Sequence, residues 1–222
     1  MKTESPHLVG RATPVLSLSK RPDAAGKARP TVNHLTVMNY VKLNKMNKVR
    51  IIGGDMRSRV ISFPDAEGLR PTPDRVRETL FNWLGQTLYG RTCLDLFAGS
   101  GALGFEAASR GAERVVMVEK NPAVCRSLQE NLKKLGCTNI FAHCQDGLEF
   151  ASRDVQRYDV IFLDPPFQSE CLPRLLEILP QHLSENGVLY VESGAPVDVP
   201  PPWQVVKSGK AGQVYYQLLQ VS

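Results

Sequence analysis

The sequence lacks several features that mark whole classes of protein. No apolar run approaches the roughly 20 residues needed to cross a membrane, and no secretory signal is evident near the N-terminus. The five cysteines are odd in number and none forms a C-x-x-C pair, while the four histidines do not cluster. We therefore expect no disulfide framework, no metal site, no membrane attachment, and a reducing, cytoplasmic location.

The length of 222 residues suits one domain with an appendage, and a hydrophobic content of 42% suffices for one sizeable core. Residues 1–47 contain four prolines, no sustained hydrophobic period, and eight Lys/Arg against two Asp/Glu. We expect this basic extension to be mostly disordered, and translation could instead begin at Met46. Residues 48–222 hold 19 Lys/Arg against 20 Asp/Glu, so the basic character belongs to the extension.

Residues 48–90 form a second segment, with its own pattern. Short β-like runs at 49–52 and 60–63 flank glycines and arginines, which predicts a β-hairpin with a basic tip. A helix should follow, capped by Thr72 with Pro73 in its first turn. Its apolar face would contain Val76, Leu80 and Trp83.

Positive charge gathers over residues 48–77, where seven Lys/Arg face four acids. Either a polyanion such as RNA docks there or this is an ordinary solvated face. The candidate RNA-binding residues are Arg50, Arg57, Arg59, Arg70, Arg75 and Arg77. Arg75 and Arg77 could instead order a lid over a cofactor, and residues two apart on a helix do not face the same way.

From residue 91 to 222, strand-like and helix-like runs alternate. We place strands near 92–97, 114–118, 138–142, 158–163 and 187–192, and helices near 102–110, 122–135, 147–153 and 170–183. This alternation predicts a mostly parallel α/β sheet with helices on both faces. Residues 203–206 and 214–221, joined by a tight connection over 207–212, should add a closing antiparallel pair.

A glycine-rich turn organises this domain. Gly99, Gly101 and Gly104 have G-x-G-x-x-G spacing between the first of these strands and the following helix, which is typical of nucleotide-binding turns. Glu119 ends the next strand 20 residues after Gly99, where a carboxylate can bind ribose hydroxyls or simply lie in solvent. Asp95, inside the strand, would repel a pyrophosphate and suits a cationic ligand such as S-adenosylmethionine, although it could also brace a loop.

The sequence Asp164-Pro165-Pro166-Phe167 follows the fourth strand and should lie at the carboxyl edge of the sheet. Asp164 and the Pro165 carbonyl can accept both hydrogens of a base amine, which leaves the amine lone pair free to attack a methyl group. The two prolines would fix that carbonyl, and Phe167 could stack on the base. The alternative is a plain turn, because Asp-Pro-Pro is common in loops.

Residues 48–222 resemble a class I S-adenosylmethionine-dependent methyltransferase, and in detail the bacterial 16S rRNA guanine-N2 methyltransferases of the small subunit (the RsmD type). The resemblance rests on residues 50–54, 70–84, 95–104, 119–121 and 164–167. The 70–84 stretch distinguishes this family, and the extension departs from it. The matched cofactor-binding positions are Asp95, Phe97, Ala98, Gly99, Ser100, Gly101, Gly104, Glu119 and Asp146.

The resemblance implies a Rossmann-like domain over 91–222, an RNA-facing segment over 48–90, and S-adenosylmethionine as cofactor. It implies that Asp146 binds the adenine amine of the cofactor. It also implies a guanine of 16S rRNA as substrate, within the 30S subunit or a late assembly intermediate, and we expect a monomeric enzyme. From the residues alone, an adenine-N6 methyltransferase, a non-catalytic RNA-binding protein and a nicotinamide oxidoreductase stay open.

Overall fold

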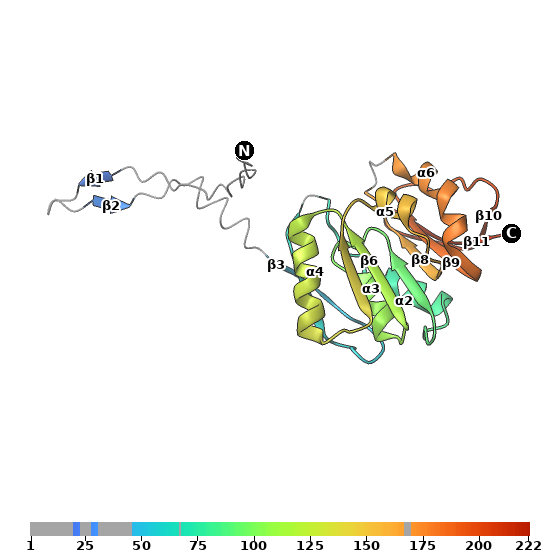
Figure 1. Cartoon of the computed structure of the whole chain (residues 1–222), viewed down its shortest axis with the longest axis horizontal. Helices are drawn as coiled ribbons and strands as arrows, with labels where there is room; N and C mark the ends of the chain where they lie inside the picture. The colour runs from blue at the N-terminus through green and yellow to red at the C-terminus, as the bar shows by residue number, and fades with distance from the viewer. Residues whose placement is uncertain (1–19, 23–27, 31–45, 67, 167–169) are drawn as a thin grey trace, which may run out of the picture. The chain divides into compact units, whose positions relative to one another are not determined.

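The computed structural model describes residues 20–22, 28–30, 46–66, 68–166 and 170–222, and Figure 1 shows the whole chain. The chain divides into two units, Met1–Asn44 and Lys45–Ser222. In the first unit, β1 (Lys20–Pro22) pairs antiparallel with β2 (Ala28–Pro30). Most of the extension that the sequence predicts to be disordered lies outside the described residues, as does Phe167.

The second unit alternates strands and helices along most of its length. It begins with the strands β3 (Met46–Arg50) and β4 (Val60–Pro64) and the helix α2 (Asp74–Trp83). There follow β5 (Thr92–Asp95), α3 (Ala102–Ser109), β6 (Arg114–Glu119), α4 (Pro122–Leu135), β7 (Ile140–Cys144) and α5 (Gly147–Arg153). The last elements are β8 (Tyr158–Leu163), α6 (Cys171–Ile178), the 3₁₀ helix η1 (Leu179–His182), β9 (Leu183–Ser193), β10 (Trp203–Ala211) and β11 (Val214–Val221).

Seven strands form one sheet in the order β10-β11-β9-β8-β5-β6-β7. The pairs from β9 to β7 are all parallel, while β11 runs antiparallel to both β9 and β10. In Figure 1, β8 to β11 lie together in orange and red, with α4 at the other side of the domain. This is the Rossmann-like arrangement that the sequence predicts, so the fold class is confirmed.

Side chains alternate between the two faces of the sheet, and each face has its own core. On the face that packs against α2, α3, α4 and the β3–β4 hairpin, here called the α3 face, the sheet contributes Cys93, Val115, Met117, Val160, Phe162, Val188, Tyr190, Tyr216 and Leu218. On the face that packs against α5 and α6, here called the α6 face, it contributes Leu94, Val116, Val118, Ile161, Leu163, Leu189, Val191 and Leu219. Helices therefore cover both faces, as predicted.

The N-terminal hairpin and helix form as predicted, except that β3 spans Met46–Arg50 rather than 49–52 and the helix lacks its predicted cap. β3 and β4 pair antiparallel, and α4 holds them through Asn131, which donates to the Ser62 carbonyl at 2.8 Å and accepts from its N–H at 3.1 Å. α2 begins directly after Pro73, but the predicted cap by Thr72 is wrong. The Thr72 hydroxyl is buried and donates to the Glu192 carboxylate at 2.9 Å, because a distant acceptor is available to it.

Proline shortens the helix predicted over 170–183. α6 ends at Ile178, and Pro180 lies in the following 3₁₀ helix. Proline has no N–H, so it cannot donate to the carbonyl of Leu176 as an α-helix would require. The indole N–H of Trp203 donates to that carbonyl instead, at 2.7 Å, and so ties the start of β10 to α6.

The closing hairpin has a shorter turn than predicted. β10 continues to Ala211, which lies opposite Val214, so the turn consists of Gly212 and Gln213. Residues 207–211 therefore belong to a strand, where the sequence predicts a connection. Gly209 lies opposite Tyr216, and its missing side chain leaves room for the tyrosine ring, which would approach a Cβ at Gly209 within 2.5 Å. No helix within the described residues is long and apolar enough to cross a bilayer.

Candidate active site at the carboxyl edge of the sheet

Four acidic side chains lie at the carboxyl edge of the sheet, on its α3 face. The strand register places Met117, Asp95, Phe162 and Tyr190 side by side on β6, β5, β8 and β9. Two residues further along three of these strands come Glu119, Asp164 and Glu192. β5 lies between β6, which follows it in the chain, and β8, which the chain reaches later on the opposite side of β5. Ligands bind open α/β sheets at such a point, where the strand order reverses.

Asp95 is a buried carboxylate with a shifted pKa. Its side chain is 3% exposed, and its Oδ2 accepts a hydrogen bond from the Gly104 N–H at 3.0 Å. Burial raises the pKa of Asp95 to about 7, the Gly104 N–H opposes this, and Glu119 and Glu192 add to it. A cationic group beside Asp95 would lower that pKa again, so the position suits a cation.

The glycine turn fits closely around Asp95. A Cβ at Gly104 would lie 2.4 Å from the Met117 Cε and 3.2 Å from the Asp95 Oδ2, so the close approach of α3 requires glycine. Gly101 has a φ of 81°, a left-handed conformation that glycine adopts readily, and it precedes α3 directly. Ser100 is buried at the same turn, with its hydroxyl accepting from the Ala102 N–H at 3.3 Å.

Glu119 lies beside the glycine turn, as the spacing predicts. Its two carboxylate oxygens accept from the Gly99 N–H at 2.9 Å and from the Asn121 N–H at 2.6 Å. Ala98 at the turn donates its N–H to the Val118 carbonyl at 2.8 Å, which joins β5 and β6 just before Glu119. The glycine turn and Glu119 thus form one continuous surface, and the role of Glu119 toward a ribose stays a prediction.

Asp146 lies at the next strand end and caps α5. Its Oδ1 accepts from the N–H groups of Leu148 and Glu149 at 3.0 and 3.2 Å, and its Oδ2 lies 3.5 Å from the Lys120 ammonium. The ring of Phe97 lies against Gly147, where a Cβ would approach it within 3.0 Å. Phe97 and Asp146 are therefore brought close to each other, next to the glycine turn.

Asp164 lies directly after β8, between Asp95 and Glu192. Burial raises the pKa of Asp164 well above its usual value, and the nearby carboxylates of Glu192 and Asp95 raise it further. Pro165 is buried and Pro166 is exposed. Among the residues that the structure describes, no Lys or Arg forms an ion pair with Asp164, Asp95 or Glu192, and no group of acids, His and Cys is arranged to hold a metal ion.

Sequence reasoning missed Glu192, Thr72 and Leu69 at this edge. Glu192 is 3% exposed, and its Oε1 accepts from the Thr72 hydroxyl at 2.9 Å and the Tyr190 hydroxyl at 3.0 Å. The Cδ1 of Leu69 would lie 2.7 Å from a Cβ at Gly99, so Leu69 covers the glycine turn. A carboxylate directly after an apolar run was the available signal for Glu192, because Glu119 and Asp164 share it.

Comparison with known proteins identifies the family to which this chain belongs. The family model described as "Conserved hypothetical protein 95" matches residues 49–220. The ribosomal RNA small subunit methyltransferase D of Escherichia coli K12 is 41% identical over 179 residues, which cover 78% of this chain and 90% of the relative. This chain belongs to that methyltransferase family. The Haemophilus influenzae member is 40% identical over 185 residues, 80% of this chain and 96% of its own length.

A solved structure shows the same fold at the same level of identity. The Escherichia coli protein yhhF, described as a methyltransferase, superimposes with a TM-score of 0.72 at 40% identity. The match covers 79% of this chain and 98% of that one. The residues that the family model matches, 49–220, lie within the second unit of this chain, Lys45–Ser222.

One predicted RNA contact of this family member is corrected by the structure. Arg77 is fully buried on α2, where its guanidinium donates to the Glu106 carboxylate at 3.1 Å, the Arg50 carbonyl at 2.8 Å and the Asp74 carboxylate at 2.6 Å. These contacts contradict a role at an RNA-facing surface. Arg75, two residues earlier, is exposed, so the two arginines do face different ways, as predicted.

Glu106 is the centre of this buried network. Its two oxygens accept from the N–H groups of Ile52 and Gly53, both at 2.8 Å, and from Arg77 and Arg110 at 3.1 and 2.9 Å. The network fastens the start of the hairpin loop to α3 and α2. Both carboxylate oxygens of Glu106 therefore accept hydrogen bonds from donors of this same chain.

The other predicted RNA-binding arginines are exposed but do not form one cluster. Arg70 lies between Leu69, which contacts Gly99, and Thr72, which contacts Glu192, so it adjoins the candidate site. Arg57 lines a separate pocket of about 570 Å³ with Arg110, at the end of α3 away from the glycine turn. Arg50 and Arg59 flank that same hairpin loop.

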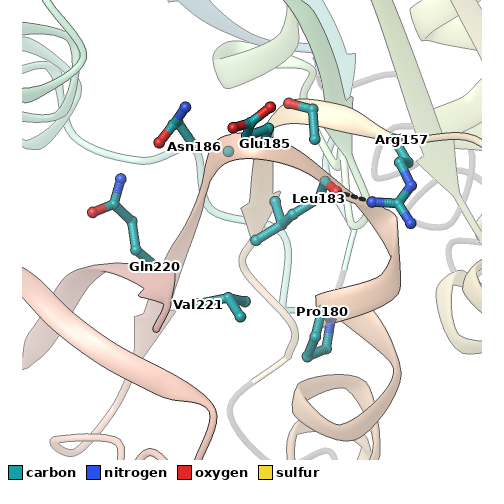
Figure 2. Close-up of a pocket in the computed structure, with 9 residues that line it drawn as sticks. Arg157, Pro180, Leu183, Glu185, Asn186, Gln220 and Val221 are labelled. Atoms are coloured by element: carbon teal, nitrogen blue, oxygen red, sulfur yellow. Dashed lines mark hydrogen bonds between the residues drawn. The ribbon is translucent and has the colours of Figure 1, made fainter.

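Figure 2 shows another pocket of this methyltransferase, at the amino edge of the sheet. It encloses about 440 Å³ and is lined by Pro180, Glu185, Asn186, Gln220 and others, with Arg157 donating to the Leu183 carbonyl at 3.2 Å. Tyr158 and Leu183 begin β8 and β9 here, whereas Asp164 and Glu192 lie at the other end of these strands. The pocket is therefore remote from the candidate site by the length of a strand, roughly 20 Å.

Proposed function

We propose that this protein transfers a methyl group from S-adenosylmethionine to the N2 amine of a guanine in 16S rRNA of the 30S subunit, in the cytoplasm. The observation that carries the proposal is that the buried Asp95 and the partly buried Asp164 lie at one sheet edge, with no cation beside them among the described residues. One acid suits a cationic cofactor and the other suits a donor-rich substrate. The names of the relatives, which are small-subunit rRNA methyltransferases, support the choice of RNA.

The residues around the glycine turn fit S-adenosylmethionine. Asp95 would face its charged amino-acid end, because a buried carboxylate with a raised pKa gains most from a cation. Glu119 would accept from the ribose hydroxyls, and Asp146 from the adenine amine through the oxygen that does not cap α5. Phe97, Ala98, Gly99, Ser100, Gly101 and Gly104 would complete the surface. When bound, the cofactor supplies the electrophilic methyl group.

Asp164 and the Pro165 carbonyl would hold the reacting amine. Each accepts one N–H of the guanine N2, which turns the nitrogen lone pair toward the methyl group for an in-line transfer. Pro166 restricts the direction of the Pro165 carbonyl, and Phe167, which lies outside the described residues, would stack on the base. As the bond between N2 and the methyl carbon forms, the bond from that carbon to sulfur would break, with S-adenosylhomocysteine as the leaving group. The methylated nitrogen, acidic only at that stage, would then lose its proton to solvent, so Asp164 acts as an acceptor.

The exposed arginines next to the site would bind the substrate. Arg70 lies between Leu69 and Thr72, which contact the carboxyl edge, and the exposed Arg75 follows in the first turn of α2. Phosphates of a splayed-out nucleotide would pass there. The described part of the second unit is one sheet with its covering helices and the N-terminal hairpin, so the shape of the assembled particle would supply much of the specificity. A small, monomeric enzyme that docks on the 30S subunit or a late intermediate is consistent with this.

The test is methylation with labelled S-adenosylmethionine of 30S particles, stripped 16S rRNA and plasmid DNA, followed by nucleoside mass analysis. We expect N2-methylguanosine from the particle, at one position. The Asp164→Ala protein should lose at least about 100-fold in rate yet still bind the cofactor by calorimetry. Glu185→Ala, at the amino-edge pocket, is the matched control and should keep full activity. N6-methyladenine as the product, or a near-normal rate for Asp164→Ala, would refute the proposal.

A further inference from the structure

Glu192 is a second carboxylate beside the one that the proposed reaction uses. Leu163 and Val191 are register partners on β8 and β9, and both belong to the core on the α6 face. The next residues, Asp164 and Glu192, therefore face the other way and lie about one strand spacing apart, ~4.8 Å. The Glu192 carboxylate raises the pKa of Asp164, which is consistent with this proximity.

Both hydrogen bonds that Glu192 accepts reach the same carboxylate oxygen, Oε1. The hydroxyls of Thr72 and Tyr190 both donate to its Oε1, at 2.9 and 3.0 Å. Within the described residues, its Oε2 accepts no hydrogen bond and no cation pairs with the group. Two fixed donors on one oxygen set the direction of the carboxylate and leave the other oxygen to accept from a ligand.

Guanine offers a matching edge next to its N2 amine. Its N1 carries a hydrogen, so N1–H and N2–H₂ form adjacent donors, whereas the N1 of adenine or 2-aminopurine carries a lone pair. A buried carboxylate attracts the first pattern and repels the second, and sites that hydrogen-bond a substrate discriminate strongly against analogues that leave them unpaired.

We propose that Glu192 accepts the N1–H of the target guanine while Asp164 and Pro165 hold its N2 amine, so that Glu192 selects guanine over bases with a lone pair at N1. This inference rests on the proposed function and assigns a specificity-determining residue within it. Thr72 and Tyr190 are positioning residues, since they act by orienting Glu192.

The experiment uses 30S particles reconstituted with guanine or 2-aminopurine at the mapped target position. 2-Aminopurine keeps the reacting amine but has a lone pair at N1. We expect the wild-type protein to methylate guanine roughly 10- to 100-fold faster. Glu192→Gln should lose most of this preference: its carbonyl can still accept from Thr72 and Tyr190, while its NH₂ group would face N1 and repel the guanine hydrogen.

The controls separate recognition from a structural role. Thr72→Val and Tyr190→Phe each remove one donor to Glu192 but keep its charge. Each should therefore reduce the preference for guanine only in part, and by less than Glu192→Gln does. Equal wild-type rates on the two bases, or an equal loss on both bases for Glu192→Gln, would overturn the inference. The wild-type comparison holds even if a variant folds poorly. Failure of the wild type to methylate guanine N2 at all would instead refute the proposed function.

Discussion

Two clusters of buried charge lie on the same face of the sheet, and they differ in how they are satisfied. Around Glu106, two guanidinium groups and two backbone N–H groups meet one carboxylate. Around Asp164, three carboxylates share one edge with neutral donors only, among the described residues. The first cluster is complete within the chain and serves the fold. The second receives only neutral donors from the described residues, and under the proposed function a ligand would bring the positive charge and further donors that it lacks.

The largest effect should come from breaking the complete cluster. Glu106→Ala leaves the Arg77 guanidinium buried beside unpaired backbone donors, and removing one partner of a buried ion pair costs about 3–5 kcal/mol. We expect this loss in the free energy of unfolding, measured by urea denaturation. Glu113→Ala, at an exposed acid, is the control and should change it little. A loss below about 1 kcal/mol for Glu106→Ala would show that the network does not stabilise the fold.

Removing a charge from the carboxylates around Asp164 should instead raise the free energy of unfolding. At pH 8 the buried Asp95 is ionised at a cost, because its pKa is raised from 3.8 to about 7. Asp95→Asn removes that cost, which at 1.36 kcal/mol per pKa unit is on the order of 4 kcal/mol or less. The ligand-free variant should melt at a higher temperature than the wild type and bind S-adenosylmethionine more weakly. A lower melting temperature for Asp95→Asn would mean that the charge is compensated.

Glu119→Gln is the matched control for Asp95→Asn. The Glu119 carboxylate is half-buried and accepts from two backbone N–H groups. Replacing it with a neutral amide therefore does not remove a comparable cost of burying a charge. We expect no rise in melting temperature for this variant, although cofactor affinity should fall because the ribose would lose an acceptor.

The smallest effect is the pH dependence of cofactor binding. The contribution of Asp95 to folding is complete below pH 3.8 and is lost as the pH rises through about 7, since its folded pKa is raised. A cation favours the ionised form, so the affinity for S-adenosylmethionine should fall up to about tenfold per pH unit below pH 7 and level off above it. Calorimetry from pH 5.5 to 8.5 measures this. The Asp95→Asn protein should show a flatter profile, and an equal slope would assign the effect to another group.

The elements and the location of the site follow from local sequence. Buried apolar strands such as β6 and β8 are continuous runs, and α4 has Asn121 before Pro122 at its start and Gly136 at its end. Asp95, Glu119 and Asp164 each end or follow such a strand, which is enough to predict that they gather at one edge. The roles of these residues toward a cofactor or a base stay predictions.

The partners of polar groups do not follow from local sequence. Thr72 has the sequence context of a helix cap, yet it donates to Glu192, 120 residues away. Arg77 has the context of a basic surface helix, yet it contacts Glu106 and the Arg50 carbonyl from inside the core. Both depend on where α2 packs, and the choice between a local and a distant partner is made by tertiary structure. Glu192 was missed for the same reason, because what singles it out is its contacts with Thr72 and Tyr190 and its effect on Asp164.

The hydrogen bond between Thr72 and Glu192 has a consequence for how the chain is made. α2 packs against strands that are synthesised much later, with Phe81 against Phe162 and Trp83 against Tyr216. During synthesis, α2 emerges long before β8, β9 and β11 and must wait with its apolar face uncovered. Contacts this distant in sequence slow folding and favour association with chaperones. The segment that contains Thr72 therefore reaches its place at the candidate site only when Glu192 of β9 is available, after most of the chain has left the ribosome.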